Sequence, residues 1–359
     1  MLYSRIIVYL SSANILLRAL RQRDDLSSSV QTILLMIPSS FPRRAKAPSR
    51  YVRDFASILQ TVPSIQSLAL RPLPHRRDPD PPYFPREAFL GVILQPPQLQ
   101  NLRRFVFDGR ALSPDSLSHL SHAVFPLLED LSVTDLALAN SFVWPSCPSL
   151  MRLKLGLCRF LDRNVAIRLP VSALKQIDMD QCRSDEDDAD ISDSLYPFAS
   201  SLEVLRIDTI LFHREIHLID FSRLTSVRHL ALILNELSFP SPLLPPTVAR
   251  IPELESLVLT CFGIFDSFSP WSVVGCLISL LQSGKNLLPA LRVLVIQAHS
   301  HEWRAPPARK EQSSHLQVLC DARGIDLTLR DCSVGDPRRG LPNHSSCRVL
   351  GLEGILADC

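Results

Sequence analysis

The sequence predicts an α/β fold in the form of a solenoid (horseshoe), with a parallel β-sheet on its concave face and helices on its convex face. Three observations predict it: a short apolar pattern that recurs along the chain, turn-forming residues ahead of many copies, and helical periodicity between them. The chain has 359 residues, of which 46% are hydrophobic and 21% charged. This composition is typical of chains that bury a large core, so we expect a folded array.

The recurring pattern is apolar-x-x-apolar-x-apolar, and it occurs ten times. Its copies begin at Val30, Ile65, Leu102, Leu128, Leu150, Leu174, Leu202, Val227, Leu254 and Leu291. Successive copies from Leu102 to Leu254 are 22 to 28 residues apart, and the outer ones are 35 to 37 residues apart. A period of 20 to 29 residues is typical of leucine-rich repeats, so we interpret the outer copies as repeats with insertions.

The leucine-rich-repeat consensus also has an asparagine or cysteine eight residues after the first leucine. This chain has Cys158, Cys182 and Asn235 at that position. We expect these side chains to lie inside the turn after a strand, where Asn satisfies backbone groups and Cys is a compact apolar substitute. The two cysteines are therefore interpreted as structural rather than catalytic.

Three segments between the patterns have helical periodicity and are expected on the convex face. They are residues 51–60, 113–125 and 269–284. In the last of these, Ser269 is expected as the N-cap, Pro270 in the first turn and Gly284 as the terminating residue.

Composition disfavours several classes of function. The net charge of +2 lacks the basic excess that binding to phosphate backbones usually needs, so nucleic acid is not an expected partner. The nine cysteines include no CxxC pair, and no GxSxG, GxGxxG or P-loop motif occurs. We do not expect this chain to be an enzyme, and we expect no catalytic residue, cofactor or metal site. His299 and His301 are not interpreted as metal ligands.

Polar residues interrupt the apolar N-terminus, at Arg5, Ser11, Ser12 and Asn14. This pattern disfavours a signal peptide or a membrane span. The expected location is cytoplasmic or nuclear, without a membrane partner.

Residues 2–35, LYSRIIVYLSSANILLRALRQRDDLSSSVQTILL, resemble the stretch that follows the F-box in fungal F-box proteins with leucine-rich repeats. The matching elements are Leu2, Tyr3, Val8 and Leu10, a helix near Ser12 to Arg21, and then Asp25, Leu26, Val30, Ile33 and Leu35. The resemblance implies a solenoid that recognises the substrate of a ubiquitin-ligase adaptor. No LP-x-E phrase precedes Leu2, so an F-box is expected to be missing here, and binding to a Skp-type linker subunit is expected only if an upstream F-box exists.

These expectations divide the chain into three parts. Residues 1–29 are expected to form a strand-helix cap, 30–332 a solenoid of about ten to eleven irregular repeats, and 333–359 a C-terminal cap or tail. The expected function is binding to a protein substrate, either as part of the ubiquitin-ligase adaptor or as a stand-alone scaffold without a ubiquitin-ligase role.

The candidate binding site is the concave face, where the residue between the last two apolar positions of each pattern is exposed. Charged residues gather at its centre. They are Lys154, Asp178 and Arg206, joined by Asp180 and Asp208 two residues further along their strands. The alternative is a solvated charge network whose members compensate one another and bind nothing.

A second candidate is the acidic run at 184–193, SDEDDADISD. The simplest interpretation is a solvated loop. The functional alternatives are phosphorylation at Ser184 or Ser192 and recognition by a basic partner.

Overall fold

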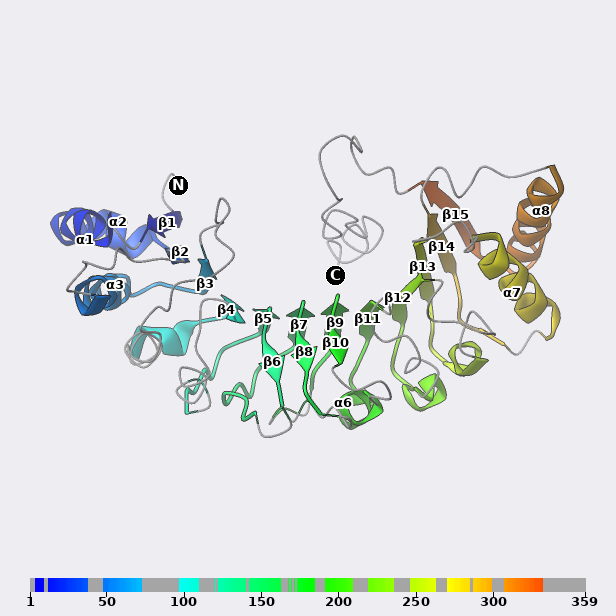
Figure 1. Ribbon diagram of the computed structural model, residues 1–359, viewed down its shortest axis with the longest axis horizontal. Helices are drawn as coiled ribbons and strands as arrows, with labels where there is room; N and C mark the ends of the chain where they lie inside the picture. Colours follow the sequence, from blue (N-terminus) through cyan, green and yellow to red (C-terminus); the bar gives the residue numbers. More distant parts are fainter. Residues whose placement is uncertain are drawn as a thin grey trace. The chain divides into compact units, whose positions relative to one another are not determined.

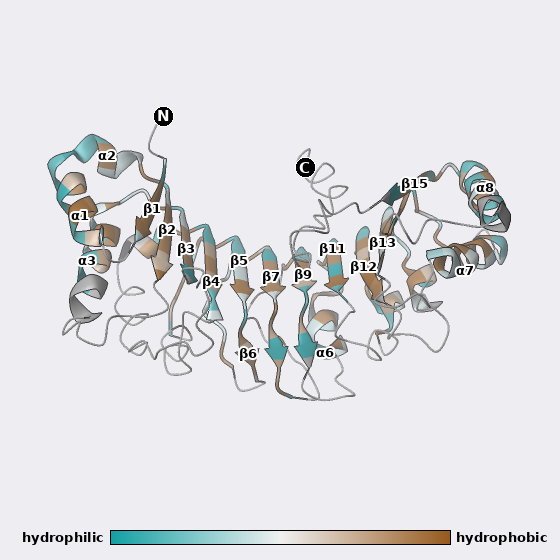
Figure 2. Ribbon diagram, turned by 45° about the horizontal axis from the view of Figure 1, so that its top comes forward, coloured by the Kyte–Doolittle hydropathy of each residue, from teal (hydrophilic) through white to brown (hydrophobic). Residues whose placement is uncertain are grey.

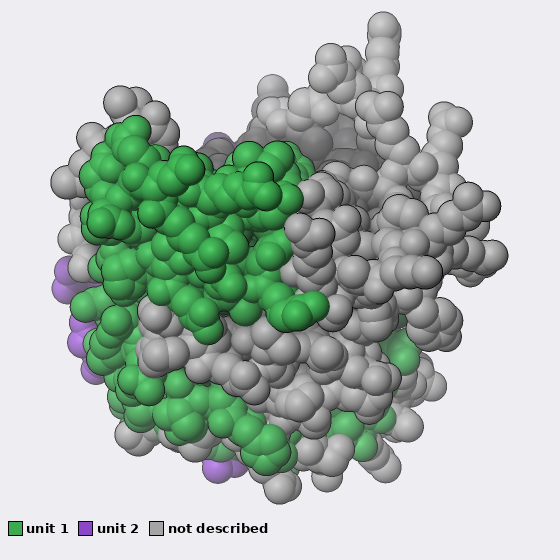
Figure 3. Space-filling view, turned by 90° about the vertical axis from the view of Figure 1, so that its left-hand side faces the viewer, with its two compact units in different colours: residues 1–201 green, residues 202–359 purple. Residues whose placement is uncertain are grey.

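The structure is a computed structural model, and it divides into two compact units, residues 1–201 and residues 202–359. It describes residues 4–9, 12–37, 48–72, 97–109, 120, 122–139, 142–162, 167, 169, 171, 173–184, 191–208, 219–235, 246–262, 270–284, 287–298 and 307–331. Figure 3 shows the described part of unit 1 in green. Each unit is described by itself below.

Unit 1 contains a parallel sheet in which neighbours in sequence are also neighbours in space (Figure 1). Its strands, in order, are β1 (Arg5–Tyr9), β2 (Thr32–Ile37), β3 (Ser67–Pro72), β4 (Arg104–Asp108), β5 (Asp130–Thr134), β7 (Arg152–Gly156) and β9 (Gln176–Asp180). Consecutive parallel strands need a crossover connection. One repeat therefore supplies one strand and the segment that returns to the start of the next.

The apolar pattern places its last two members on one face of this sheet. Because side chains alternate along a strand, Leu153 and Leu155 of β7 share a face, and both are buried. The same register joins them to Leu131 and Val133 of β5. Equivalent positions of β2, β3, β4 and β9 are also buried, so these residues form a continuous core.

Helices cover the core face at the start of unit 1. They are α1 (Ala13–Gln22), α2 (Asp24–Ser29) and α3 (Pro48–Thr61), and α1 packs against α3. The side chains that they bury include Leu17 and Leu20 of α1 and Phe55 and Ile58 of α3. Later repeats use shorter elements: the 3₁₀ helix η2 (Pro97–Asn101), α6 (Ser192–Leu195) and the 3₁₀ helix η4 (Tyr196–Phe198).

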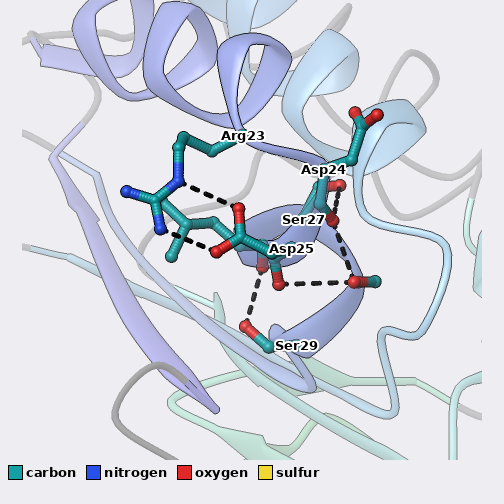
Figure 4. A network of polar contacts seen from close by, with 7 residues as sticks. Arg23, Asp24, Asp25, Ser27 and Ser29 are labelled. Atoms are coloured by element: carbon teal, nitrogen blue, oxygen red, sulfur yellow. Dashed lines mark hydrogen bonds and ion pairs between the residues drawn. The ribbon is translucent and has the colours of Figure 1, made fainter.

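Polar contacts fix the junction between α1 and α2 (Figure 4). Arg23 donates two hydrogen bonds to the Asp25 carboxylate, at 2.9 and 2.6 Å. This contact lowers the pKa of Asp25 below its usual value. The hydroxyls of Ser27 and Ser29 donate to the carbonyls of Asp24 and Leu26, and both bonds lie within the six residues of α2.

A second, three-stranded parallel sheet follows the main one in the middle repeats, and the sequence did not indicate it. It consists of β6 (Ala137–Leu138), β8 (Arg159–Phe160) and β10 (Arg183–Ser184). In each repeat two residues join the long strand to the short one, and the first has a positive φ of 53°: Asp135, Leu157 and Gln181. Gly109 lies against the first of these turns, because a Cβ at Gly109 would come within 2.2 Å of the Asp135 carbonyl oxygen.

Unit 2 repeats the architecture with longer strands. They are β11 (Val204–Asp208), β12 (His229–Asn235), β13 (Ser256–Phe262), β14 (Val293–Ala298) and β15 (Asp326–Asp331), paired in parallel in that order. The 3₁₀ helices η6 (Phe221–Arg223) and η8 (Pro246–Arg250) connect the first strands. The helices α7 (Pro270–Gln282) and α8 (Pro307–Asp321) pack against each other.

An arginine from beyond α8 holds the C-terminal end of α7. The Arg323 guanidinium donates to the carbonyl oxygens of Leu281, Gly284 (2.7 Å) and Leu287 (3.1 Å). Leu281 belongs to the last turn of α7, whose carbonyls have no partner inside the helix, whereas Gly284 and Leu287 belong to the segment that follows.

The predicted α/β class with a parallel sheet is confirmed. All ten copies of the pattern end in a described strand, and β1 and β15 add one strand at each end of the series. Helices occur at 48–61 and 270–282, as expected near 51–60 and 269–284. Residues 110–119 and 121 of the expected 113–125 helix lie outside the described residues, as does 333–359.

Two local expectations were wrong. Ala123 to Phe125, the end of the expected 113–125 helix, are not helical and Val124 forms a parallel bridge to Ser146 instead. Asn235 was expected in a turn but is the last residue of β12, because this strand is seven residues long whereas β7 and β9 have five. Cys158 and Cys182 do lie in turns, between β7 and β8 and between β9 and β10.

Candidate functional site

The candidate site is the face of the unit 1 sheet opposite the leucine core, which we call the open face. Parallel register aligns its side chains in rows that run across the strands. The middle row is Leu34, Ala69, Val106, Ser132, Lys154 and Asp178. From Ala69 onward this row is the one that the sequence predicted, but Val106 and Ser132 are buried rather than exposed. Its polar and charged end lies on β5, β7 and β9.

Lys154 and Asp178 form an ion pair within this row. The Lys154 Nζ lies 3.3 Å from an Asp178 carboxylate oxygen. Lys154 is the more exposed of the two, because 43% of its side chain is accessible against 13% for Asp178. A partner that approaches this face would therefore meet the lysine first. Asp180, at the end of β9, is half-buried.

A second charged group, which the sequence did not predict, lies one row away on the same face. The Asp130 carboxylate lies between two arginines of the neighbouring strands, 3.6 Å from Arg104 Nε and 3.9 Å from Arg152 Nε. Both arginines are more than half exposed, whereas Asp130 is mostly covered. These residues occupy the first position of each strand. The sequence pattern predicted only the residue between its last two apolar positions, and this row lies two residues earlier on each strand.

Charges of both signs lie at the start of the strands. Arg103 precedes β4 and donates to Glu129 at 2.7 Å. At the other end of the strands, Asp180 of β9 is half-buried, whereas Asp108 of β4 is buried. The exposed charges of this face are therefore mostly arginines paired with carboxylates of neighbouring strands.

The remaining predicted residues belong to unit 2. Arg206 is half-buried in β11, and Asp208 at the end of that strand is buried. Arg206 is in register with Ala231, Val258 and Val295. The structure thus groups Lys154, Asp178 and Asp180 in one unit, and Arg206 and Asp208 in the other.

The corresponding face of the unit 2 sheet is mainly apolar, and it is buried. Ala231, Val258 and Val295 form a cluster in which each is at most 4% exposed. Beside it the Thr260 hydroxyl donates to the Gln297 side-chain oxygen at 3.1 Å, and both residues are buried. The strands β12, β13 and β14 are therefore buried on both faces, which is unlike the charged strands of unit 1.

The acidic run is described only at its ends. Residues 185–190 lie outside the described residues, whereas Ser184 ends β10 and Ser192 begins α6. Ser192 is buried. A kinase could therefore reach Ser192 only after α6 opens locally.

The turn cysteines bond to the backbone of their own and the preceding repeat. The Cys182 thiol lies 3.3 Å from the Leu155 carbonyl oxygen, and the Cys158 thiol lies 3.5 Å from that of Gly156. Burial raises the pKa of the Cys182 thiol well above its usual value. Burial also raises the pKa of Cys147 to about 12. The contact with Cys182 instead lowers the pKa of the Cys158 thiol below its usual value. The Cys182 and Cys147 thiols therefore stay protonated and make poor nucleophiles.

Among the described residues, no three His, Cys, Asp or Glu side chains gather closely enough to hold a metal ion. His299 and His301 lie outside the described residues. No helix in the described part of the chain is long and apolar enough to cross a membrane.

Comparison with known proteins gives no assignment, because no family model and no curated protein matches the chain.

Proposed function

We propose that this chain is a leucine-rich-repeat module that binds another protein through the open face of unit 1. The single observation that supports this most is the pair of charged groups on neighbouring rows, Arg104–Asp130–Arg152 and Lys154–Asp178. Rigid parallel strands hold these side chains in fixed register. Preordered charges of both signs favour specific recognition of a complementary protein surface.

The finer proposal is that this module recognises the substrate of an F-box-type ubiquitin-ligase adaptor. It rests on the resemblance of residues 2–35, which include β1, α1, α2 and the start of β2. The alternative is a stand-alone scaffold or regulator without a ubiquitin-ligase role. Neither proposal involves catalysis by this chain.

A charge swap tests the binding face directly. In the double variant Lys154→Asp with Asp178→Lys, the ion pair is kept and the net charge is unchanged, but its direction is reversed. A purely structural pair would largely tolerate the swap, because the lysine is half exposed and such ion pairs contribute only about 0 to 1 kcal/mol to stability. A partner that recognises the charges would lose about 2 to 5 kcal/mol of binding free energy.

The measurement is quantitative affinity capture of cellular proteins, followed by titration of the protein that is captured specifically. We expect the swap to abolish capture at an unchanged melting temperature. The matched control is Arg18→Asp, because Arg18 is exposed on α1. Equal capture by the wild type and the swap would place binding elsewhere.

The two roles differ in what happens to the partner. If the chain recognises substrates for a ubiquitin ligase, depletion of the protein from cells should lengthen the half-life of the captured partner. The charge-swap variant should fail to restore turnover. An unchanged half-life, together with intact binding, would favour the stand-alone scaffold.

A further inference from the structure

The ion pairs of the open face in unit 1 are unequal, because the basic member of each is the more exposed. The side chains of Arg104, Arg152 and Lys154 are 60%, 52% and 43% exposed. The carboxylates that they contact are more covered, since only 20% of the Asp130 side chain and 13% of the Asp178 side chain are accessible. The charges that a partner would meet first are therefore basic.

The other exposed charges on the described strands of this face have the same sign. Arg5 of β1 is in register with Arg104 through β2 and β3, and it is exposed. Arg71 of β3 lies on the same face and is also exposed. The acidic residues Asp108 and Asp180 are buried and half-buried. The net charge of +2 does not reveal this basic surface, because a sum over the sequence counts covered and exposed groups equally.

Two of the cations converge on one oxygen atom. Arg104 Nε and Arg152 Nε both approach Asp130 Oδ2, at 3.6 and 3.9 Å, which is longer than a hydrogen bond. The three residues are in register on β4, β5 and β7, and each of these strands begins in teal in Figure 2. One carboxylate thus faces two guanidinium groups, so this triplet has one positive charge in excess.

The donors of these two arginines are not used within the described part of the chain. Neither the Arg104 nor the Arg152 guanidinium donates a hydrogen bond to another described group. A guanidinium has five N–H donors in a planar fork, and two of them match the two oxygens of a carboxylate. Both forks are therefore available to acidic groups of another molecule.

We propose that the open face of unit 1 binds an acidic segment of the partner protein, whose carboxylates contact Arg104 and Arg152. This inference rests on the proposed function, because it names the chemistry of the partner that the same face binds. A carboxylate of the partner supplies the negative charge that Asp130 alone does not. Lys154, one row further along the strands, is the nearest additional cation for the same segment.

The carboxylates of this face favour an acidic peptide over nucleic acid. A nucleic-acid strand has a phosphate at every nucleotide, and its charge cannot be omitted where the protein is acidic. On this face Asp130, Asp178 and Asp180 lie between or beside the cations. A peptide can place acidic residues over the arginines and neutral residues over these carboxylates, so it matches the mixed pattern better.

The test is a titration of the purified 359-residue chain into a short fluorescein-labelled oligoglutamate peptide, followed by fluorescence anisotropy. Oligolysine and oligoglutamine peptides of the same length are the references. We expect oligoglutamate alone to bind, and to bind more weakly when the salt concentration is raised to about 0.15 M. The double variant Arg104→Gln with Arg152→Gln should weaken this binding at least about tenfold.

The matched control is Arg18→Gln with Arg21→Gln, which removes the same charge from exposed positions of α1 and should bind like the wild type. Thermal melts show whether each variant is folded. If the double variant is not, the single variant Arg152→Gln leaves Asp130 beside Arg104 and should still weaken binding by about threefold or more.

Three results would overturn the proposal. They are absence of oligoglutamate binding to the wild type, equal binding by the wild type and the folded arginine variant, and equal binding of oligoglutamate and oligolysine. A single-stranded DNA of equal charge is titrated in parallel. Tighter binding of this DNA than of oligoglutamate, with loss in the arginine variant, would assign the face to nucleic acid and would also contradict the proposal.

This inference and the proposed function fail in different ways. If the charge swap at Lys154 and Asp178 abolishes capture of a cellular protein, but oligoglutamate neither binds nor displaces that protein, the face binds protein through other chemistry. Only the present inference is then wrong. If oligoglutamate binds through Arg104 and Arg152 while the swap leaves capture intact, the face binds carboxylates but is not where the captured protein binds, and the proposed function is wrong.

Discussion

Alternate residues of each strand face opposite sides of the sheet, so neighbouring residues of one strand have different consequences when they are changed. Leu153 is buried in the core of unit 1, whereas Lys154 lies on the open face. The sequence predicted both placements, because the register follows from which positions of the pattern are apolar. Asp130 shows the limit of this reasoning, since its contacts depend on how the arginines of two other repeats extend over the sheet.

The substitution Leu153→Asp should abolish cooperative folding. It would bury an unpaired carboxylate between stacked repeats, at a cost of about 4 kcal/mol or more. The measurement is a thermal melt followed by circular dichroism. The control Lys154→Gln should melt within a few degrees of the wild type, because it removes only a half-exposed ion pair. Equal melting temperatures for both variants would show that the register is wrong.

The stability of the protein should decrease as the pH falls below about 6.5, and His229 is one cause. Its Nδ1 is buried without a hydrogen-bond partner in the described part of the chain. Burial lowers the pKa of His229, against the opposing influence of Glu255. Because the pKa of His229 is lower in the folded state, the unfolded chain binds the proton at a higher pH than the folded protein does. The neutral imidazole therefore contributes its full stability above the unfolded-state pKa. This contribution is lost as the pH falls through the folded-state pKa.

The check is the unfolding free energy of the wild type and of His229→Gln, from urea titrations at several pH values between about 7.5 and 5. The variant should lose less stability over this interval, because it has no imidazole to protonate. Parallel curves for the two proteins would assign the pH dependence to other groups.

At the scale of elements, the long strands and the helices α3 and α7 could be predicted, and the short ones could not. Five-residue strands with buried leucines produce a clear pattern, whereas β6, β8 and β10 have two residues each. The end of α7 is a further example. Gly284 was expected to terminate this helix, but Arg323 also donates to the carbonyl of Leu281 near its end, from 42 residues away in the sequence. No local pattern encodes such a contact.

The substitution Arg323→Ala should destabilise unit 2 by about 2 to 3 kcal/mol, because it removes hydrogen bonds from a charged donor to the end of α7. Arg323→Lys should recover only part of this loss, since an ammonium group cannot contact several carbonyls in the planar geometry of a guanidinium. Urea denaturation measures both values. If Lys restores full stability, the charge near the helix end matters more than the individual hydrogen bonds.

At the scale of the whole molecule, the sequence predicted a single series of repeats but not its division into two units. The apolar pattern continues across residue 201, so nothing in its spacing distinguishes the two sides. The middle row of the sequence pattern shows that this face is charged in unit 1 and apolar in unit 2. The sequence did not show that the face in unit 2 is buried, because burial depends on what packs over the strands.

Hydrogen exchange should follow this contrast. The amides of β12, β13 and β14 are expected to exchange most slowly, because these strands are buried on both faces and paired on both sides. Those of β1 should exchange fastest among the described strands, because β1 pairs there only with β2. Mass spectrometry of peptides after timed labelling measures this order, and faster exchange in β13 than in β1 would contradict it.

The two-residue turns of the middle repeats have a consequence for how the array can grow. The main strands β7 and β9 begin at residues 152 and 176, and the short strands β8 and β10 begin at 159 and 183. Both sheets thus advance by the same 24 residues. A tandem duplication of that length would add one strand to each sheet and preserve every pairing. Inserting a single residue into one of the two-residue turns would instead shift the register of the short sheet relative to the long one. This region can therefore gain or lose length only by a whole repeat, or in the segment that returns to the next repeat.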